Sequence, residues 1–159
     1  MITLTIALGL ASTLPKAWEG NWFGPMEYSD PKGGKHSIQM ELSIQPIAGG
    51  HTWTMVFHAE KDDRRLYEIR ADPKREGGFL IDEKNGIILD AYLKGDTLVS
   101  SFSVGNSLLI SRDKLERQTL IHEIETFDLG SPHKTKSGEE SALSYPFRSS
   151  QRATLKRRK

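Results

Sequence analysis

One histidine stands out among the residues whose side chains could do chemistry. His122 lies in the segment Leu-Ile-His-Glu-Ile, two positions from both Leu120 and Ile124. Because side chains alternate between the two faces of a strand, we expect His122 on the same apolar face as these two residues. A neutral imidazole there could hold the polar end of a ligand or ligate haem iron. The alternative is a core or rim histidine hydrogen-bonded to a backbone carbonyl.

The other histidines do not indicate a metal site. Three of them fall in or beside expected loops and one on a polar strand face, so none has a second ligand at metal spacing. The chain has no cysteine, which excludes disulfides, thiolate metal sites and cysteine nucleophiles. These four histidines are His36, His51, His58 and His133.

No reaction is indicated by the carboxylates or the serines. Glu123 and Glu125 share the strand face opposite His122, which is typical of a solvated face rather than an acid/base pair. The chain contains no Gly-x-Ser-x-Gly nucleophile elbow and no glycine-rich phosphate loop before a helix. We therefore expect no catalytic residues, no metal and no resident cofactor.

Turn-forming residues divide the middle of the chain into short segments. The sharpest signal is Asn85-Gly86, because both central positions of a type I′ turn need a positive φ, so we expect a two-residue loop there. The other clusters are Asp30 to Gly34, Gly49-Gly50, Lys61 to Asp63, Asp72 to Gly78, Gly95-Asp96, Gly105-Asn106 and, more weakly, Asp113-Lys114.

Between these turns the residues alternate between apolar and polar, as in Ile38, Met40, Leu42 and Ile44. This pattern predicts nine short strands between residues 18 and 127, and no segment before residue 130 has a helical apolar period. Consecutive hairpins leave two unpaired edges unless the sheet closes. We expect an all-β fold: one antiparallel up-and-down barrel of about eight to ten strands over residues 17–130. A sandwich or an open half-barrel is the alternative.

The interior of such a barrel is either filled by side chains or encloses one small ligand. If the apolar face points inward, a set of mostly large apolar residues would line the ligand site; the alternative for each is a packed core. The candidate ligand-binding residues are Met40, Leu42, Trp53, Met55, Phe57, Tyr67, Ile69, Phe79, Leu89, Phe102, His122 and Ile124.

The two ends of the chain differ in composition from the middle. Residues 1–13 form an uncharged apolar run, and residues 1–16 are expected to be a signal peptide and lead-in or, alternatively, an extra strand. A signal over residues 1–11 would make the protein secreted or periplasmic, and otherwise it would be cytoplasmic. Residues 131–159 hold eight Lys or Arg and only two Glu, so we expect a flexible basic tail.

The start of the first expected strand resembles the calycins, the group of lipocalins, fatty-acid-binding proteins and their bacterial relatives. Gly20 and Trp22 form a Gly-x-Trp, followed by a meander of short strands through residue 128. The resemblance implies that Trp22 seals one end of the barrel and that an arginine near the last strand packs across it. Arg117 is the best candidate for that arginine, and Arg112 is the second.

The resemblance also implies a cavity for a small hydrophobic ligand, and hence a carrier or sensor rather than an enzyme. Two alternatives stay open: a haem-binding or catalytic barrel that uses His122, and a solid-core interaction module that contacts a partner through its basic tail or an outer face. We expect no specific nucleic-acid partner and no transmembrane span, since no other apolar run is comparable in length. The oligomeric state stays open.

Overall fold

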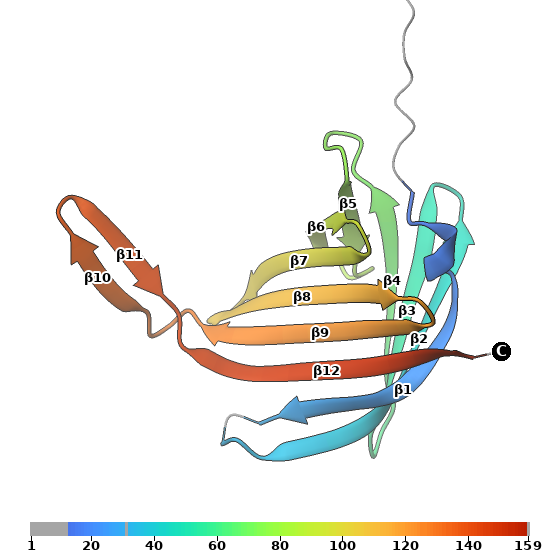
Figure 1. Ribbon diagram of the computed structural model, residues 1–159, viewed down its shortest axis with the longest axis horizontal. Helices are drawn as coiled ribbons and strands as arrows, with labels where there is room; N and C mark the ends of the chain where they lie inside the picture. The colour runs from blue at the N-terminus through green and yellow to red at the C-terminus, as the bar shows by residue number, and fades with distance from the viewer. Residues whose placement is uncertain (1–12, 31, 159) are drawn as a thin grey trace, which may run out of the picture.

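The computed structural model describes residues 13–30 and 32–158, and all of its long elements are strands (Figure 1). The expected signal peptide therefore lies almost entirely outside the described residues. The elements are η1 (Lys16–Trp18), β1 (Gly20–Ser29), β2 (Lys35–Ile47), β3 (Gly50–His58), β4 (Asp63–Ala71), β5 (Gly78–Asp82), β6 (Ile88–Lys94), β7 (Thr97–Val104), β8 (Ser107–Glu116), β9 (Thr119–Asp128), β10 (His133–Ser137), β11 (Glu140–Ser144) and β12 (Phe147–Arg158).

Ten of the strands close into one antiparallel barrel. Strands β1 to β9 follow one another as a meander, and β12 lies between β9 and β1 and closes the sheet. The predicted up-and-down barrel is confirmed, and the nine strands expected before residue 128 are all present. A closed sheet has no unpaired edge, which removes the risk of edge-to-edge association.

Two of the glycine turns lie where they were predicted, and a third is shifted by one residue from the expected Gly49-Gly50. Ala48-Gly49, Gly95-Asp96 and Gly105-Asn106 each join two strands by two residues, with the flanking residues paired in register. The glycine of each turn has a positive φ, between 55° and 75°. Glycine adopts this conformation without the steric cost that a Cβ would bring, which is why these turns were visible in the sequence.

Two other turn predictions are wrong. Asn85-Gly86 does not form a two-residue loop, because the turn runs from Glu83 to Ile87, and the backbone N–H of Glu83 donates to the Ile87 carbonyl at 3.0 Å. The Asn85 side chain instead accepts a hydrogen bond from the Ile87 N–H at 2.9 Å, an Asx-type contact that favours the longer loop. Asp113-Lys114 is not a turn either, since both residues lie inside β8.

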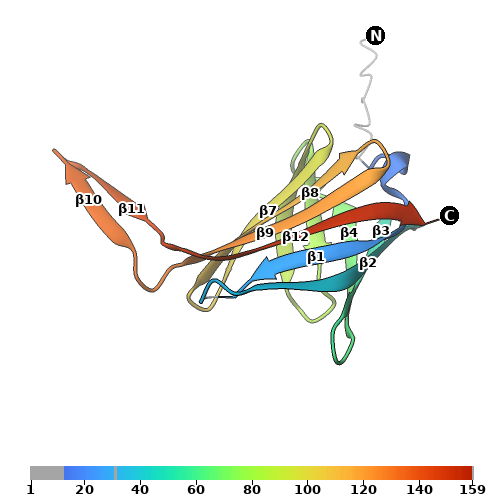
Figure 2. The ribbon, with the colours of Figure 1, turned by 60° about the horizontal axis from the view of Figure 1, so that its bottom comes forward.

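The expectation of a disordered tail over residues 131–159 is also wrong. β10 and β11 form an exposed hairpin that projects from the barrel, and β12 is a barrel strand (Figure 2). Ala153 and Leu155 on β12 are fully buried. Arg152 points outward and pairs with Glu123 on β9. Backbone pairing on both sides therefore orders a segment that its charge alone would leave disordered, and the barrel domain extends beyond residue 130.

One end of the barrel is sealed by η1 and two tryptophans. Trp18 and Trp22 are each 1 % exposed, and the Trp22 indole N–H donates to the Trp18 carbonyl at 3.0 Å. The Trp18 ring also packs against Trp53, with ring centroids 6.2 Å apart. We call this the closed end; the β2–β3, β6–β7 and β8–β9 turns lie there too, because the strands are antiparallel.

The arginine that covers Trp22 is Arg157, so the choice of Arg117 is wrong. The Arg157 guanidinium carbon lies 4.3 Å from the centre of the Trp22 ring, and the same group donates to the Ala17 and Glu19 carbonyls. Arg157 belongs to β12, the strand that was mistaken for a tail. Arg117 lies in the β8–β9 turn instead, where its φ is 54°.

Gly20 and Arg112 have other roles in this region. Gly20 has a φ of 133°, and a Cβ at this position would collide with the Arg157 guanidinium, so the glycine makes room for that side chain. Arg112 instead pairs with Glu125 at 2.7 Å, an ion pair between neighbouring strands β8 and β9. Arg112 therefore does not cover Trp22, and Gly20 is needed where it stands because a side chain there would displace Arg157.

Candidate functional site

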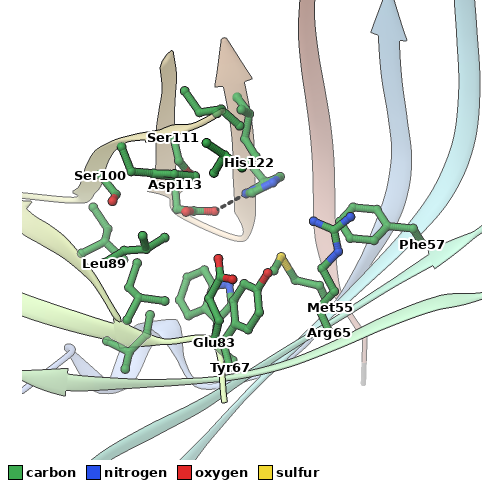
Figure 3. A pocket seen from close by; sticks show the side chains of 18 residues that line it. Met55, Phe57, Arg65, Tyr67, Glu83, Leu89, Ser100, Ser111, Asp113 and His122 are labelled. Carbon is green, nitrogen blue, oxygen red and sulfur yellow. Dashed lines mark hydrogen bonds and ion pairs between the residues drawn. The ribbon is translucent and has the colours of Figure 1, made fainter. Parts of the chain in front are cut away.

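The barrel encloses a cavity of about 420 Å³ between the closed end and the opposite end (Figure 3). Val104 and Arg65 line it, and both are exposed, so the cavity reaches solvent at the end where β4 begins and β7 ends. We call this end the mouth. The volume falls within the usual range for small-molecule sites. The barrel interior is therefore not completely filled by side chains, as a solid-core module would require.

Nine of the twelve candidate ligand-binding residues line this cavity. They come from strands β3, β4, β6, β7 and β9, so the alternating pattern brought residues from much of the sheet to one interior surface. The lining candidates are Trp53, Met55, Phe57, Tyr67, Ile69, Leu89, Phe102, His122 and Ile124.

The other three candidates are packed elsewhere in the interior. Met40 and Leu42 on β2 are completely buried, and Phe79 on β5 is 1 % exposed. All three belong to the same apolar cluster as the residues of the closed end. These three correspond to the packed-core alternative that the sequence left open for each candidate.

His122 is the most unusual side chain of the cavity. It is 3 % exposed, and its Nδ1 lies 2.7 Å from an Asp113 carboxylate oxygen directly across the β8–β9 pair. In a neutral ring whose Nδ1–H donates to this carboxylate, Nε2 carries a lone pair. Nε2 is buried and, among the residues described, has no hydrogen-bond partner. A polar atom buried in this way is satisfied when a ligand supplies the missing partner.

A second polar group lies on the other side of the cavity, on β4 and the end of β5. Figure 3 shows Tyr67, Glu83 and Arg65 together across from the His122 side. Burial raises the pKa of the Tyr67 hydroxyl, and the nearby Glu83 carboxylate raises it further, while Arg65 offsets part of the effect. Tyr67 and Glu83 are half-buried, whereas Arg65 reaches solvent.

Sequence reasoning missed the polar members of the lining. Asp113 was assigned to a turn, yet it stands at the position opposite His122 on the neighbouring strand. Ser100 and Ser111 face each other in register in the same way. Extending the strand pairing outward from the confirmed turns would have placed all three residues on the inward face, because residues paired in register point to the same face of the sheet. Arg65 and Glu83 flank turns, where alternation of apolar and polar residues is weakest.

Other kinds of site find little support in the part of the chain that is described. Within residues 13–30 and 32–158, no three His, Cys, Asp or Glu side chains gather as a metal site would require. In the same residues, no helix has the length and apolar character needed to cross a membrane. Among the cavity-lining residues, His122 with Asp113 and Glu83 with Tyr67 are therefore the groups with a chemical role to explain.

Comparisons with known proteins support the fold alone. No protein-family model matches the chain, and no curated protein is similar to it. A solved structure with a similar fold is a protein of unknown function from the DUF3598 family of Nostoc punctiforme. It is 13% identical, with a TM-score of 0.62 over 89% of this chain. The match covers 48% of that protein, so this chain spans about half of its length.

Proposed function

We propose that this barrel binds a small, largely apolar molecule in its interior, as a carrier or sensor and without catalysis. The observation that carries the proposal is the cavity itself: about 420 Å³, with aromatic and aliphatic walls and one buried His122 nitrogen that has no hydrogen-bond partner among the described residues. Apolar contact would supply most of the affinity, at about 25 cal/mol for each Å² removed from water. A hydrogen bond to His122 would orient the ligand.

The arrangement at the closed end supports the likeness to calycins. Trp22 on the first strand is covered by Arg157 on the last strand, which is the pairing that the resemblance implied for an arginine near the last strand. Because one end is sealed and the other is open, a ligand would enter through the mouth, and its inner part would be shielded from water. Both features favour a carrier that shields its ligand from water.

The uncharged dye prodan tests the proposal, because its emission shifts to shorter wavelength in an apolar site. We expect saturable binding to the wild-type protein, and weaker binding to Ser111→Phe, whose new ring would enter the cavity. Ser101→Phe is the matched control, since Ser101 is exposed on the neighbouring strand. Circular dichroism would verify that both variants fold. A wild-type protein that leaves prodan emission unchanged would refute the proposal.

Haem binding is a second candidate function, and one observation favours it. Histidines that ligate metals almost always donate their other ring N–H to a carboxylate or carbonyl, and Asp113 stands in that position behind His122. Adding haem to the wild-type protein and to His122→Ala distinguishes the two candidates. A Soret band that depends on His122 would support haem, and identical spectra would remove it.

The third alternative, a module that contacts a partner through its basic tail, loses its premise. A partner-binding tail would allow residues 131–159 to be deleted without loss of stability. That segment contains β12, which pairs with both β1 and β9 and buries Ala153 and Leu155. Deletion would open the barrel, so a loss of partner capture after it would say nothing about a contact through the tail.

A further inference from the structure

We propose that the cavity selects an apolar or aromatic molecule that carries a protonated amine, and discriminates against a carboxylate of the same size. This ligand class deepens the proposed function and rests on it. The charges that line the cavity carry the inference, together with the buried His122 nitrogen. Five side chains with a charge or a titratable ring line it, namely Arg65, Tyr67, Glu83, Asp113 and His122.

Arg65 is a poor receptor for an anionic ligand. Its guanidinium already makes two hydrogen bonds to the Asp63 carboxylate, at 2.8 and 3.1 Å, and lies over the Phe57 ring. Its side chain is 47% exposed, so water screens the charge. Apart from His122, Arg65 is the one basic side chain of the cavity wall in the described residues. An anion entering the cavity would therefore meet no cation that is not already neutralised.

Glu83 is the reverse case, a carboxylate without a cation. Within residues 13–30 and 32–158 no Lys, Arg or His lies within ion-pair distance of it, and its hydrogen-bond partner is the Asn85 side-chain amide at 3.2 Å. The Glu83 carboxylate is the second-largest cause of the raised pKa of Tyr67, after burial. Its charge therefore acts on a side chain that lines the cavity. Because a half-buried carboxylate prefers a partner of opposite charge, an ammonium group suits this position.

Two further polar side chains of the wall, His122 and Ser100, offer hydrogen-bond acceptors toward the cavity. Asp113 holds the Nδ1 side of His122, which leaves the Nε2 lone pair as an acceptor in the neutral ring. The Ser100 hydroxyl donates to the Asp90 carbonyl at 2.6 Å, so toward the cavity it offers lone pairs. These acceptors and the Glu83 carboxylate suit the N–H donors of an amine better than the oxygens of a carboxylate.

The aromatic walls add to the same preference. Trp53, Tyr67 and Phe102 line the cavity with rings that Arg65 does not cover. The face of an aromatic ring attracts a cation, and the attraction is stronger where the cation is less hydrated. We place the ammonium beside Glu83 and Tyr67, close to the mouth, where its loss of hydration is smallest. The apolar body then extends inward along the aromatic side chains.

Three ligands of equal size test the preference: phenylbutylamine, phenylbutanol and phenylbutyrate, each used to displace prodan. In the wild-type protein we expect the amine to displace the dye at a concentration about tenfold lower than the butyrate does, from one charge-assisted hydrogen bond. Glu83→Gln keeps the shape and removes the charge. In this variant we expect the affinity for the amine to fall about tenfold and that for the alcohol to stay within about twofold.

The matched control is Glu60→Gln, which makes the same change in net charge on an exposed loop residue. It should leave all three affinities unchanged. If the butyrate or the alcohol competes as well as the amine, and Glu83→Gln changes nothing, the amine preference is overturned while ligand binding stands. If prodan binds to no variant and none of the three ligands binds by calorimetry, both proposals fail.

Discussion

The closed end and the cavity half of the barrel are built from the same ten strands and differ in how they use their interior positions. At the closed end, Trp22, Leu120 and Leu155 are almost completely buried and packed, and the Arg157 guanidinium has carbonyl and aromatic partners. In the cavity half, Glu83 and the Nε2 atom of His122 lack such partners within the described residues.

The two halves of the sheet therefore differ in packing: the closed end is filled with apolar side chains, and the cavity half keeps open space beside polar groups. Packed apolar side chains with satisfied polar groups are what a stable core needs. A void lined by polar atoms without partners weakens a core, and under the proposed function a bound molecule would supply the missing contacts.

Removal of β12, by ending the chain at Pro146, should abolish the barrel. Without β12, β1 and β9 lose the partner that each is paired with, and the sheet has two long unpaired edges. We expect loss of the cooperative thermal transition seen by circular dichroism. Replacing residues 131–145 by a short Gly-Ser linker is the control, because β10 and β11 are exposed throughout. A truncated chain that still melts cooperatively would contradict this role of β12.

Leucine-to-alanine substitutions in the two halves should differ in cost. Leu120→Ala, at the fully buried closed end, should lower the free energy of unfolding by about 2–5 kcal/mol, because it leaves a cavity in a packed core. Leu109→Ala enlarges a void that already exists, and Leu109 is only half-buried, so its cost should be below about 2 kcal/mol. Urea denaturation measures both, and equal costs would remove the distinction between the halves.

Asp113→Ala should lower the free energy of unfolding by about 1–3 kcal/mol, because it leaves a second buried nitrogen of His122 without a partner. The double variant Asp113→Ala, His122→Phe should recover part of this loss, since no polar atom of the pair is then buried. A double-mutant cycle from urea denaturation gives the coupling between the two residues. Zero coupling would show that the 2.7 Å contact contributes nothing to stability.

Glu83→Gln should have the smallest effect on stability, within about 0.5 kcal/mol at neutral pH. It should also lower the pKa of Tyr67, since the carboxylate is one of the causes that raise that pKa. Phenolate absorbance measures the shift, and Tyr67→Phe identifies which of the four tyrosines is responsible. An unchanged titration would place Glu83 too far away to act on Tyr67.

The raised pKa of Tyr67 also predicts how stability responds to alkali. The folded state holds the phenol proton more tightly than the unfolded chain, whose value is about 10.0. The contribution of Tyr67 to stability is therefore complete below pH 10 and declines as the pH rises from there through the pKa of the folded protein. Glu83→Gln should reduce this decline.

Much of the barrel could be predicted because its signals are local. The turns at Gly49, Gly95 and Gly105 need a positive φ that glycine adopts readily, and the strands between them alternate because one face is buried. The sequence did not predict β12, because the inward side of this strand offers only Ala153 and Leu155 as buried apolar residues. Its order comes from pairing with β1, which no local pattern reports.

The candidate site was predictable in its apolar part only. Aromatic and aliphatic residues such as Trp53 and Phe102 follow the alternation directly. Asp113 and Glu83 do not, because a polar residue on an inward face looks like a turn or a solvent-facing position until its partner across the sheet is known. His122 was visible because its two apolar neighbours fixed its face.

The position of β12 between β9 and β1 also has a consequence for how the chain folds. Arg157 reaches the carbonyl of Glu19, a residue 138 positions earlier, so the seam closes between segments from opposite ends of the described chain. During synthesis, strands β1 to β9 leave the ribosome before β12, so β1 and β9 remain unpaired sheet edges until β12 emerges. Contacts so distant in sequence slow folding and lengthen the time in which a nascent chain can associate with others. We expect refolding to be slow and to give lower yields as protein concentration rises.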